Sequence, residues 1–379
     1  MALTYDRDYI VSGRATDAIT PNFKVKEFAA DGTLHVHREL VGALQELRDG
    51  LGAPIVIQGL TPRGARGREH RGCFAFLRTA DMDGLTGHAE RLVAATFLGA
   101  AERVGGDLFV ELPDPDHLPS LPADNALERA VRVTAAYETS GDPFQSVAGN
   151  FDGAGLSFGP LQVNFGTGTL PALFARFKMV DEAGLAACFP RADHRAEWQG
   201  VLAAPRARQI AWATAISTGP NRAGVAEPWR SYLAAVGRTE TLRAEMLRYA
   251  YDVYGRKLIV ALSWLKGLWP GKIDRFPCLN ALYDLCVQQG SLDKAHAAIR
   301  ARVAREQPTD QTALVHIAVE ERGRTASAEW RADCISRRLG ILYREPVTVK
   351  ESGTTAARQN LRVYLVRDVA VRGAEKYLT

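Results

Sequence analysis

A proline-rich stretch divides this chain of 379 residues into two regions of different pattern. Residues 112–122 read LPDPDHLPSLP, with four prolines in eleven positions. Because proline fixes φ and lacks a main-chain N–H, neither a helix nor a central strand continues through such a segment. We therefore predict a linker at residues 113–124, with one domain at 1–112 and a second at 125–379.

The first region mixes helical and strand patterns. Residues 40–48 place apolar side chains at helical spacing and stop before Gly50, whereas residues 54–57 and 107–111 read as short strands. A second helix is expected over about residues 87–104. These signals predict a small mixed α/β domain.

The second region is mainly helical. Apolar residues at helical spacing predict helices at residues 125–136, 170–177, 195–218, 229–254, 257–268, 278–289, 292–305, 311–320 and 326–341. Between the first two, the Gly/Asn/Phe-rich segment 149–169 predicts short strands and turns. We therefore expect the α+β class, with a mixed N-terminal domain followed by a mainly helical domain that carries a small β-sheet.

Charge and hydropathy exclude several classes of protein. The 47 basic and 43 acidic side chains leave a net charge of +4, too small to indicate nucleic-acid binding without a recognisable motif. No run of eighteen apolar residues exists, so we expect no membrane span. The start of the chain lacks a basic stretch followed by an apolar core, so we expect synthesis in the cytoplasm without a signal peptide.

The five cysteines share no metal-ligand spacing and are odd in number. They are typical of buried free thiols in a reducing compartment. We expect a monomer.

Two carboxylates stand on either side of a turn-rich connection. Glu138 follows the predicted helix 125–136, and Asp152 comes fourteen positions later in a glycine-rich segment. Cleavage of a glycosidic bond needs one carboxylic acid to protonate the leaving oxygen and a second carboxylate across the sugar ring. The alternative for each residue alone is a solvated helix end and an Asp-Gly turn.

The segment that Asp152 opens reads Asp152-Gly153-x-Gly155-x-Ser157-x-Gly159. It resembles the lysozyme superfamily, most closely its chitosanase branch and the related phage-type peptidoglycan hydrolases. The resemblance implies a lysozyme-like second domain in which Glu138 is the general acid, Asp152 is the base and Ser157 holds the attacking water. It implies no cofactor and no metal. Residues 281–290 are similar to the helix near the far wall of the cleft in chitosanase-like enzymes.

Two amides and a tyrosine are candidate substrate ligands. Gln162 and Asn164 lie two apart on an expected strand, so both would point to one face, where amides suit sugar hydroxyls and N-acetyl groups. The alternative for Asn164 is a structural role in the turn before residues 166–169. We expect Tyr137 and Phe158 either to stack on a sugar or to fill the core. For Phe158 we favour the core.

The charged segment 315–322 also allows two interpretations. In the first interpretation the segment forms a polar wall of a glycan groove. In the second it is a helix whose charged side chains pair at i,i+4 spacing. The second interpretation is favoured, with His316 as a structural histidine.

The first region resembles the zinc D-Ala-D-Ala carboxypeptidase family at residues 22–28, 44–49 and 52–59. The family's zinc motif, Ser-x-His-x-x-Gly-x-Ala-x-Asp, places Phe74 or Phe76 where the first histidine belongs, depending on whether Asp81 or Asp83 is matched. The strand at 108–112 carries no histidine, and His70 and His88 lack the expected spacing. We therefore expect a degenerate domain that binds cell wall and holds no zinc.

Together these features predict a muramidase-type glycoside hydrolase whose partner is the glycan strand of peptidoglycan. We expect a bacteriolytic protein that acts on the cell wall after release or delivery, as a phage or prophage endolysin or an antibacterial effector. The alternatives are a chitosanase, although Ala154 stands where chitosanases usually carry arginine, and a non-catalytic wall-binding structural protein.

Overall fold

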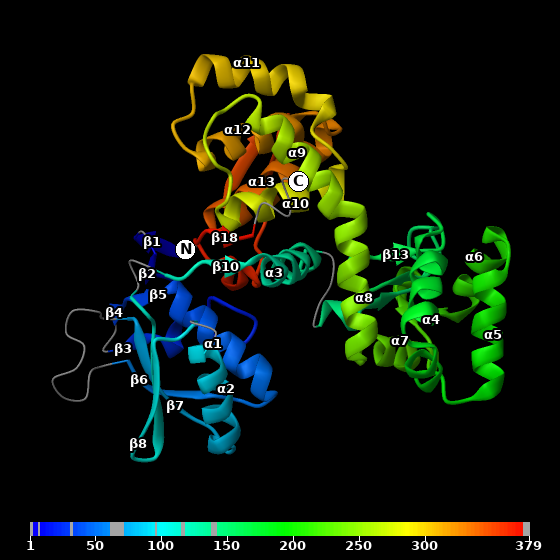
Figure 1. Ribbon diagram of the computed structural model, residues 1–379, viewed down its shortest axis with the longest axis horizontal. Coiled ribbons are helices and arrows are strands. Elements are labelled where there is room, and N and C mark those ends of the chain that lie inside the picture. The colour runs from blue at the N-terminus through cyan, green and yellow to red at the C-terminus, as the bar shows by residue number, and fades with distance from the viewer. Residues whose placement is uncertain are drawn as a thin grey trace. The chain divides into compact units, whose positions relative to one another are not determined.

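The computed structural model describes residues 3–6, 8–30, 33–60, 72–94, 97–114, 118–137 and 142–373. It confirms a mainly helical α+β chain with several small sheets. The chain divides into two compact units, each shown in Figure 1. Unit 1 spans residues 1–122, 274–278 and 332–372, and unit 2 spans 123–273, 279–331 and 373–379. The chain first passes from unit 1 to unit 2 after Pro122, within the predicted linker. Two later segments of the predicted second domain, 274–278 and 332–372, belong to unit 1.

The main sheet of unit 1 has four antiparallel strands. Their order is β6 (Val56–Gly59), β7 (Phe74–Arg78), β9 (Asp107–Glu111) and β8 (Ala100–Val104). Helices α1 (Arg38–Leu51) and α2 (Met82–Ala94) cover one face, because Leu44 and Leu85 share a buried apolar core with Leu77 and Val110 of the strands. The strand expected at 107–111 and the helix expected at 40–48 are confirmed, whereas the strand expected at 54–57 begins two residues later, at Val56.

The helix expected over residues 87–104 is wrong in its second half. Helix α2 ends at Ala94, and Ala100–Val104 forms β8 beside β9. Gly105, with φ of 62°, begins a Gly-Gly turn that joins the two strands as a hairpin. The sequence AAERV has little β-propensity of its own, so pairing with a neighbouring strand decides its structure.

The remaining strands of unit 1 are short. They are β1 (Thr4–Asp6), β2 (Tyr9–Ser12) and β5 (Val36–His37) in one sheet, the pairs β3 (Ala29–Ala30) with β4 (Thr33–Leu34) and β16 (Thr348–Glu351) with β17 (Thr354–Ala357), and the parallel pair β10 (Leu121–Pro122) with β18 (Val371–Arg372). Helix α13 (Arg331–Tyr343) contributes its residues from 332 onward to this unit.

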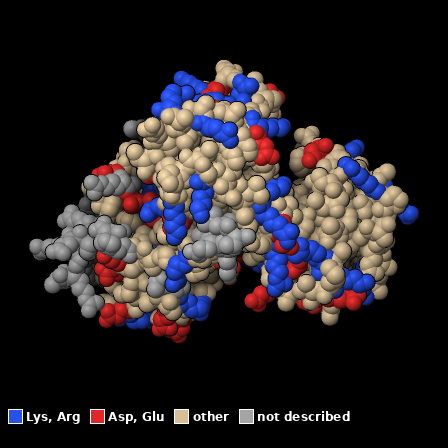
Figure 2. Space-filling model, turned by 45° about the horizontal axis from the view of Figure 1, so that its top comes forward, with Lys and Arg blue, Asp and Glu red and all other residues tan. Residues whose placement is uncertain are grey.

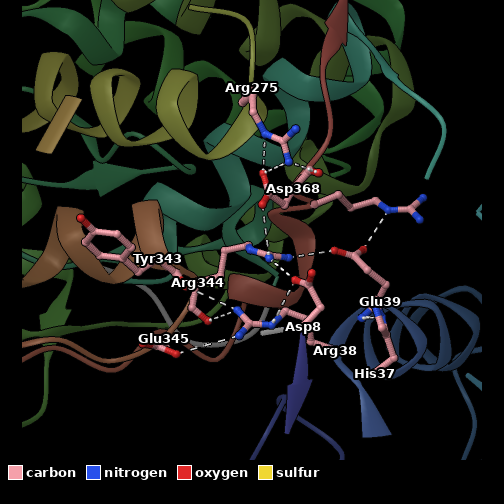
Figure 3. Close-up of polar contacts among 10 residues, drawn as sticks. Asp8, His37, Arg38, Glu39, Arg275, Tyr343, Arg344, Glu345 and Asp368 are labelled. Carbon is pink, nitrogen blue, oxygen red and sulfur yellow. Dashed lines mark hydrogen bonds and ion pairs between the residues drawn. The ribbon is translucent and has the colours of Figure 1, made fainter. Parts of the chain in front are cut away.

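An ion network centred on the buried Glu39 joins distant segments of unit 1 (Figure 3). Glu39, on the first turn of α1, accepts hydrogen bonds from Arg344 Nη1 at 3.1 Å and from Arg367 Nε at 2.8 Å. Arg344 also pairs with Asp8 and Asp368, and Arg275 Nε donates to Asp368 Oδ1 at 2.7 Å. The network therefore ties Arg344, residues 367–368 and Arg275 to the turn before β2 and to α1 of the N-terminal part through Asp8 and Glu39.

Unit 2 is built mainly from helices. They are α3 (Ala123–Ala135), α4 (Thr169–Ala187), α5 (Ala192–Ala203), α6 (Arg206–Ile216), α7 (Trp229–Arg238), α8 (Glu240–Ala250), α9 (Arg256–Lys266), most of α10 (Phe276–Gln289), α11 (His296–Glu306) and α12 (Gln311–Arg324). The predicted helices are confirmed, with two breaks. Pro205 separates α5 from α6, and Thr239 separates α7 from α8. A π-helical segment, Tyr251–Gly255, continues α8 into α9 (Figure 1).

An aromatic core holds the small sheet of unit 2 against its helices. Phe158 lies 5.9 Å from Phe174 of α4, and Phe165 lies 6.2 Å from Trp198 of α5, measured between ring centroids. Trp198 stacks on Phe189 at 5.8 Å. The interpretation of Phe158 as a core residue is confirmed, since its side chain is fully buried.

The charged segment 315–322 lies in α12, and its charges pair with one another. Glu320 accepts from His316, four residues earlier, and from Arg302 of α11. Burial raises the pKa of the Glu320 carboxyl, but the hydrogen bonds from His316 and Arg302 outweigh it and lower that pKa to about 2. The ion-pair interpretation is therefore the correct one for these residues.

Charges are spread over the surface. On the face that Figure 2 shows, basic and acidic side chains are interspersed. Among the described residues no helix is both long and apolar enough to cross a membrane.

Candidate functional site

A three-stranded antiparallel sheet in unit 2 carries the centre of the candidate site. Its strands are β11 (Val147–Ala148), β12 (Ser157–Phe158) and β13 (Val163–Asn164). Ser157 lies directly opposite Ala148 on one side and Asn164 on the other. Side chains opposite one another on neighbouring strands lie about 4.5–5.5 Å apart at Cβ. The sheet therefore brings two of the predicted site residues, Ser157 and Asn164, together.

The loop before β12 is held in place by Asn150. Its Nδ2 donates to Thr214 Oγ1 at 2.7 Å, its main-chain N–H donates to Ser217 Oγ at 2.9 Å, and its Oδ1 accepts from the Gly155 N–H at 2.8 Å. Three hydrogen bonds from one residue fix the loop to α6 and to the strand that follows it. This residue was not predicted from the sequence, because two of its three partners, Thr214 and Ser217, lie more than sixty positions away.

The three glycines of the motif each have a positive φ. Gly153 and Gly155 have φ of 84° and Gly159 has φ of 73°. A side chain at position 155 would also place its Cβ 3.1 Å from Phe165. The glycines of the motif therefore stand at the positions where the backbone of this loop favours a residue without a Cβ.

Asp152 projects from this loop into solvent. The residue is exposed, and its Oδ1 accepts a hydrogen bond from the main-chain N–H of Ala154 at 2.9 Å, the geometry of an Asx turn. One carboxylate oxygen is thereby oriented, and within the described residues no hydrogen bond is recorded for Oδ2.

Ser157 is 4% exposed, and no hydrogen bond of its hydroxyl is recorded within the described part of the chain. The hydroxyl therefore keeps both its donor and its acceptor capacity. Its role in holding the attacking water stays a prediction.

The two amides differ from expectation. Gln162 is not on the strand, because it has φ of 48° in the turn before β13 and its Nε2 donates to the Gly159 carbonyl at 2.8 Å. The expectation that Gln162 and Asn164 share one face of a strand is wrong. Asn164 accepts from the Thr167 N–H at 2.9 Å and from the Thr167 hydroxyl at 3.0 Å, which supports the structural alternative. Their roles in substrate binding stay predictions.

The predicted acid, Glu138, lies outside the described residues, and the structure describes only the residues on either side of 138–141. Tyr137 is half-buried just after α3, where its N–H donates to the Thr134 carbonyl. Beyond the gap, Asp142 accepts from the Phe144 N–H at 3.1 Å and from Arg243 Nη1 at 3.4 Å.

Phe74 and Phe76, the two residues matched to the first zinc ligand of the carboxypeptidase motif, belong to a cluster of phenylalanines. Phe74 and Phe76 of β7 are buried, and their rings lie 5.9 Å and 5.3 Å from the ring of Phe109 on β9. Asp81 accepts from the Gly84 N–H at the start of α2. His70 lies outside the described residues, and among those described no three His, Cys, Asp or Glu side chains are grouped to hold a metal. Absence of zinc stays a prediction.

Comparisons with known proteins return solved structures only. No protein-family model matches the sequence, and no curated protein matches it significantly. Two chitosanase structures of Bacillus subtilis MY002, a mutant complexed with 6 GlcN and the native enzyme, are 12% and 13% identical to the chain with TM-scores of 0.38 and 0.37. A GH46 chitosanase of Gynuella sunshinyii, complexed with chitotetraose, is 16% identical with a TM-score of 0.38.

These alignments each cover 63% of this chain and 98–100% of the chitosanases. At such identities and TM-scores the similarity by itself assigns neither a fold nor an activity.

Proposed function

We propose that the chain is a glycoside hydrolase that cleaves the glycan strand of bacterial peptidoglycan. The observation that carries the proposal is the exposed carboxylate of Asp152, oriented on a loop that three glycines and Asn150 shape, next to the strand that bears Ser157. A carboxylate held on a fixed loop is what a general base that activates a water molecule requires.

In the proposed reaction Glu138 donates its proton to the glycosidic oxygen as the bond to the anomeric carbon breaks. Asp152 takes a proton from the water whose oxygen attacks that carbon from the other face, and Ser157 orients the water. The product inverts at the anomeric carbon, so the two carboxyl groups are expected to be about 6.5–9.5 Å apart.

An acetylated wall glycan is the proposed substrate in preference to chitosan. Chitosan is a polycation and calls for an acidic groove, whereas this chain has a net charge of +4 and carries Ala154 in the variable position of the motif. Unit 1 is proposed to bind the cell wall. Delivery as a phage endolysin or as an antibacterial effector is part of the proposal.

The test is a substrate panel on the purified full chain. Release of soluble fragments from peptidoglycan, with little release from chitosan, is expected. If chitosan were cleaved faster than peptidoglycan, chitosan would be the substrate instead. If neither polymer were cleaved, the result would favour the non-catalytic alternative.

Asp152→Asn should remove most of the peptidoglycan activity. Asp310→Asn is the matched control, because Asp310 is also exposed in unit 2 and accepts a main-chain N–H, from Ala313 at 2.9 Å. Asparagine caps a helix as well as aspartate does, so the control should keep wild-type activity.

A further inference from the structure

Phe151, the residue directly before the proposed base, is exposed. It is 54% exposed, whereas each of the other phenylalanines of the chain is buried. No contact of its ring with another aromatic side chain or with a cation is recorded among the described residues. A single exposed apolar side chain is common on a protein surface, so the position of Phe151 in its loop decides what the exposure means.

The backbone on both sides of Phe151 is held by hydrogen bonds. Its own N–H donates to the Gly149 carbonyl at 3.0 Å, and the Gly149 N–H donates to the Ala223 carbonyl at 3.0 Å. Asn150 adds its bonds to α6, to Ser217 Oγ and to the Gly155 N–H, and the Asx turn of Asp152 follows. The ring is therefore exposed on a fixed backbone.

A hairpin lies against this backbone. Its strands are β14 (Ser217–Thr218) and β15 (Gly224–Val225). A Cβ at position 149 would lie 2.4 Å from the carbonyl oxygens of Arg222 and Gly224, so glycine is what allows the close approach. The loop is thus tightly packed at this point, and the exposure of Phe151 does not result from loose packing.

Phe151 and the proposed base occupy neighbouring positions. The Cα atoms of consecutive residues lie about 3.8 Å apart, and both Phe151 and Asp152 are exposed. A glycan that extends on either side of a bond cleaved at Asp152 runs past this loop. Its sugar units therefore come within reach of the ring.

The chemistry of a phenyl ring selects one part of a sugar. The two faces of a β-linked pyranose ring carry C–H groups, whereas its hydroxyl and N-acetyl groups project from the rim. A phenyl ring has an electron-rich face and no hydrogen-bonding atom, so it suits the C–H face and not the rim. Because the backbone that carries the ring is already fixed, binding orders few further groups while apolar surface leaves water.

We infer that Phe151 is a substrate-binding residue, on which a sugar ring beside the cleaved bond stacks. The inference deepens the proposed function and rests on it for the choice of an acetylated glycan. Asp152 and Ser157 act on the water in this account, whereas Phe151 holds the sugar. Phe151 precedes the Asp-Gly-x-Gly motif, so the motif does not assign it a role.

The test is calorimetric titration of the full chain with a tetrasaccharide of N-acetylglucosamine. An Asp152→Asn parent prevents cleavage, and asparagine keeps the Asx turn. This parent should bind with a dissociation constant below about 1 mM. Stacking on one face covers about 50 Å² of the ring, so adding Phe151→Ala should weaken binding about tenfold. Phe151→Tyr keeps the ring and should bind within about twofold of the parent.

Trp330→Ala is the matched control, because Trp330 is an aromatic residue of unit 2 with a similar exposure of 58%. It should bind like the parent. Binding by Phe151→Ala equal to that of the parent, an equal loss in Trp330→Ala, or no parent binding below about 1 mM would overturn the inference. Tighter binding of chitotetraose than of the acetylated tetrasaccharide, lost in Phe151→Ala, would also overturn it, because the ring would then bind ammonium groups.

Kinetics on peptidoglycan give a second readout in the chain that keeps Asp152. Phe151→Ala should raise KM and leave kcat nearly unchanged, because the ring binds the sugar and takes no part in proton transfer. An unchanged KM with normal cleavage would refute the role of Phe151 and leave the glycosidase standing. A chain that binds the tetrasaccharide through Phe151 but cleaves no glycan would retain this site and refute the glycosidase.

Discussion

Two carboxylates, Glu39 of unit 1 and Asp152 of unit 2, lie in opposite environments. In unit 1, Glu39 is buried and accepts hydrogen bonds from two arginines of the C-terminal segment, Arg344 and Arg367. In unit 2, Asp152 is exposed and its recorded hydrogen bond comes from its own loop, from the Ala154 N–H. The first carboxylate stabilises packing, whereas the second remains available for chemistry.

The comparison separates residues that hold the fold from residues that serve a reaction. A buried carboxylate that loses its partners is costly, so Glu39 and its arginines must be kept together. A chain that began near residue 124 would keep Arg344 and Arg367 but remove Glu39, and is therefore not a clean test of unit 2 alone. Single substitutions in the full chain are the better way to test each unit.

Glu138→Gln should have the largest effect. An amide cannot donate the proton that the leaving oxygen needs, so peptidoglycan hydrolysis should fall by about 10²–10⁴-fold while the unfolding midpoint is unchanged. Turbidity loss of a sacculus suspension measures the rate. Glu182→Gln, at an exposed pair with Lys178, is the control and should be neutral. More than about a tenth of wild-type activity in Glu138→Gln would remove this residue from the acid role.

Glu39→Gln should greatly lower the free energy of unfolding. It should have little effect on the rate of glycan hydrolysis. Removing one member of a buried ion network typically costs about 3–5 kcal/mol, because the remaining charges are left buried without a partner. Urea unfolding measured by circular dichroism would show it. An unfolding free energy within about 1 kcal/mol of the wild type would mean that the network is not a stabilising feature.

Ser157→Ala should reduce hydrolysis by about tenfold, less than Asp152→Asn, because the hydroxyl orients the water that Asp152 activates. The effect should appear in kcat with little change in KM. A higher KM with an unchanged kcat would instead indicate that Ser157 binds the substrate.

The smallest expected effect is on the pH dependence of stability, through His37 of unit 1. Burial lowers the pKa of His37 below its usual 6.5, and this outweighs the nearby charges of Glu39 and Asp8. The unfolded chain then binds a proton more readily, so stability should fall as the pH drops below about 6.5. His37→Asn, which retains the capping of the Glu39 N–H, should flatten this dependence in urea titrations. An unchanged slope would assign the dependence to other groups.

Local patterns predicted much of the fold, and contacts distant in sequence account for what they missed. The helices of unit 2 follow from apolar periodicity, and the glycine spacing after Asp152 reflects backbone conformations that favour glycine. The hairpin strand Ala100–Val104 depends on its partner β9, and the position of Gln162 depends on a turn with positive φ. The links from Glu39 to residues beyond 340, and from Arg176 to Glu245, leave no local signal in the sequence.

The central claim is that water, activated by Asp152, cleaves the glycan strand. The most direct measurement is mass spectrometry of the fragments that the full chain releases from peptidoglycan in ¹⁸O-labelled water. The account predicts one ¹⁸O atom at each new reducing end in the wild type and in Asp310→Asn, and almost no product with Asp152→Asn. Anhydro ends without ¹⁸O, formed equally well by Asp152→Asn, would contradict it.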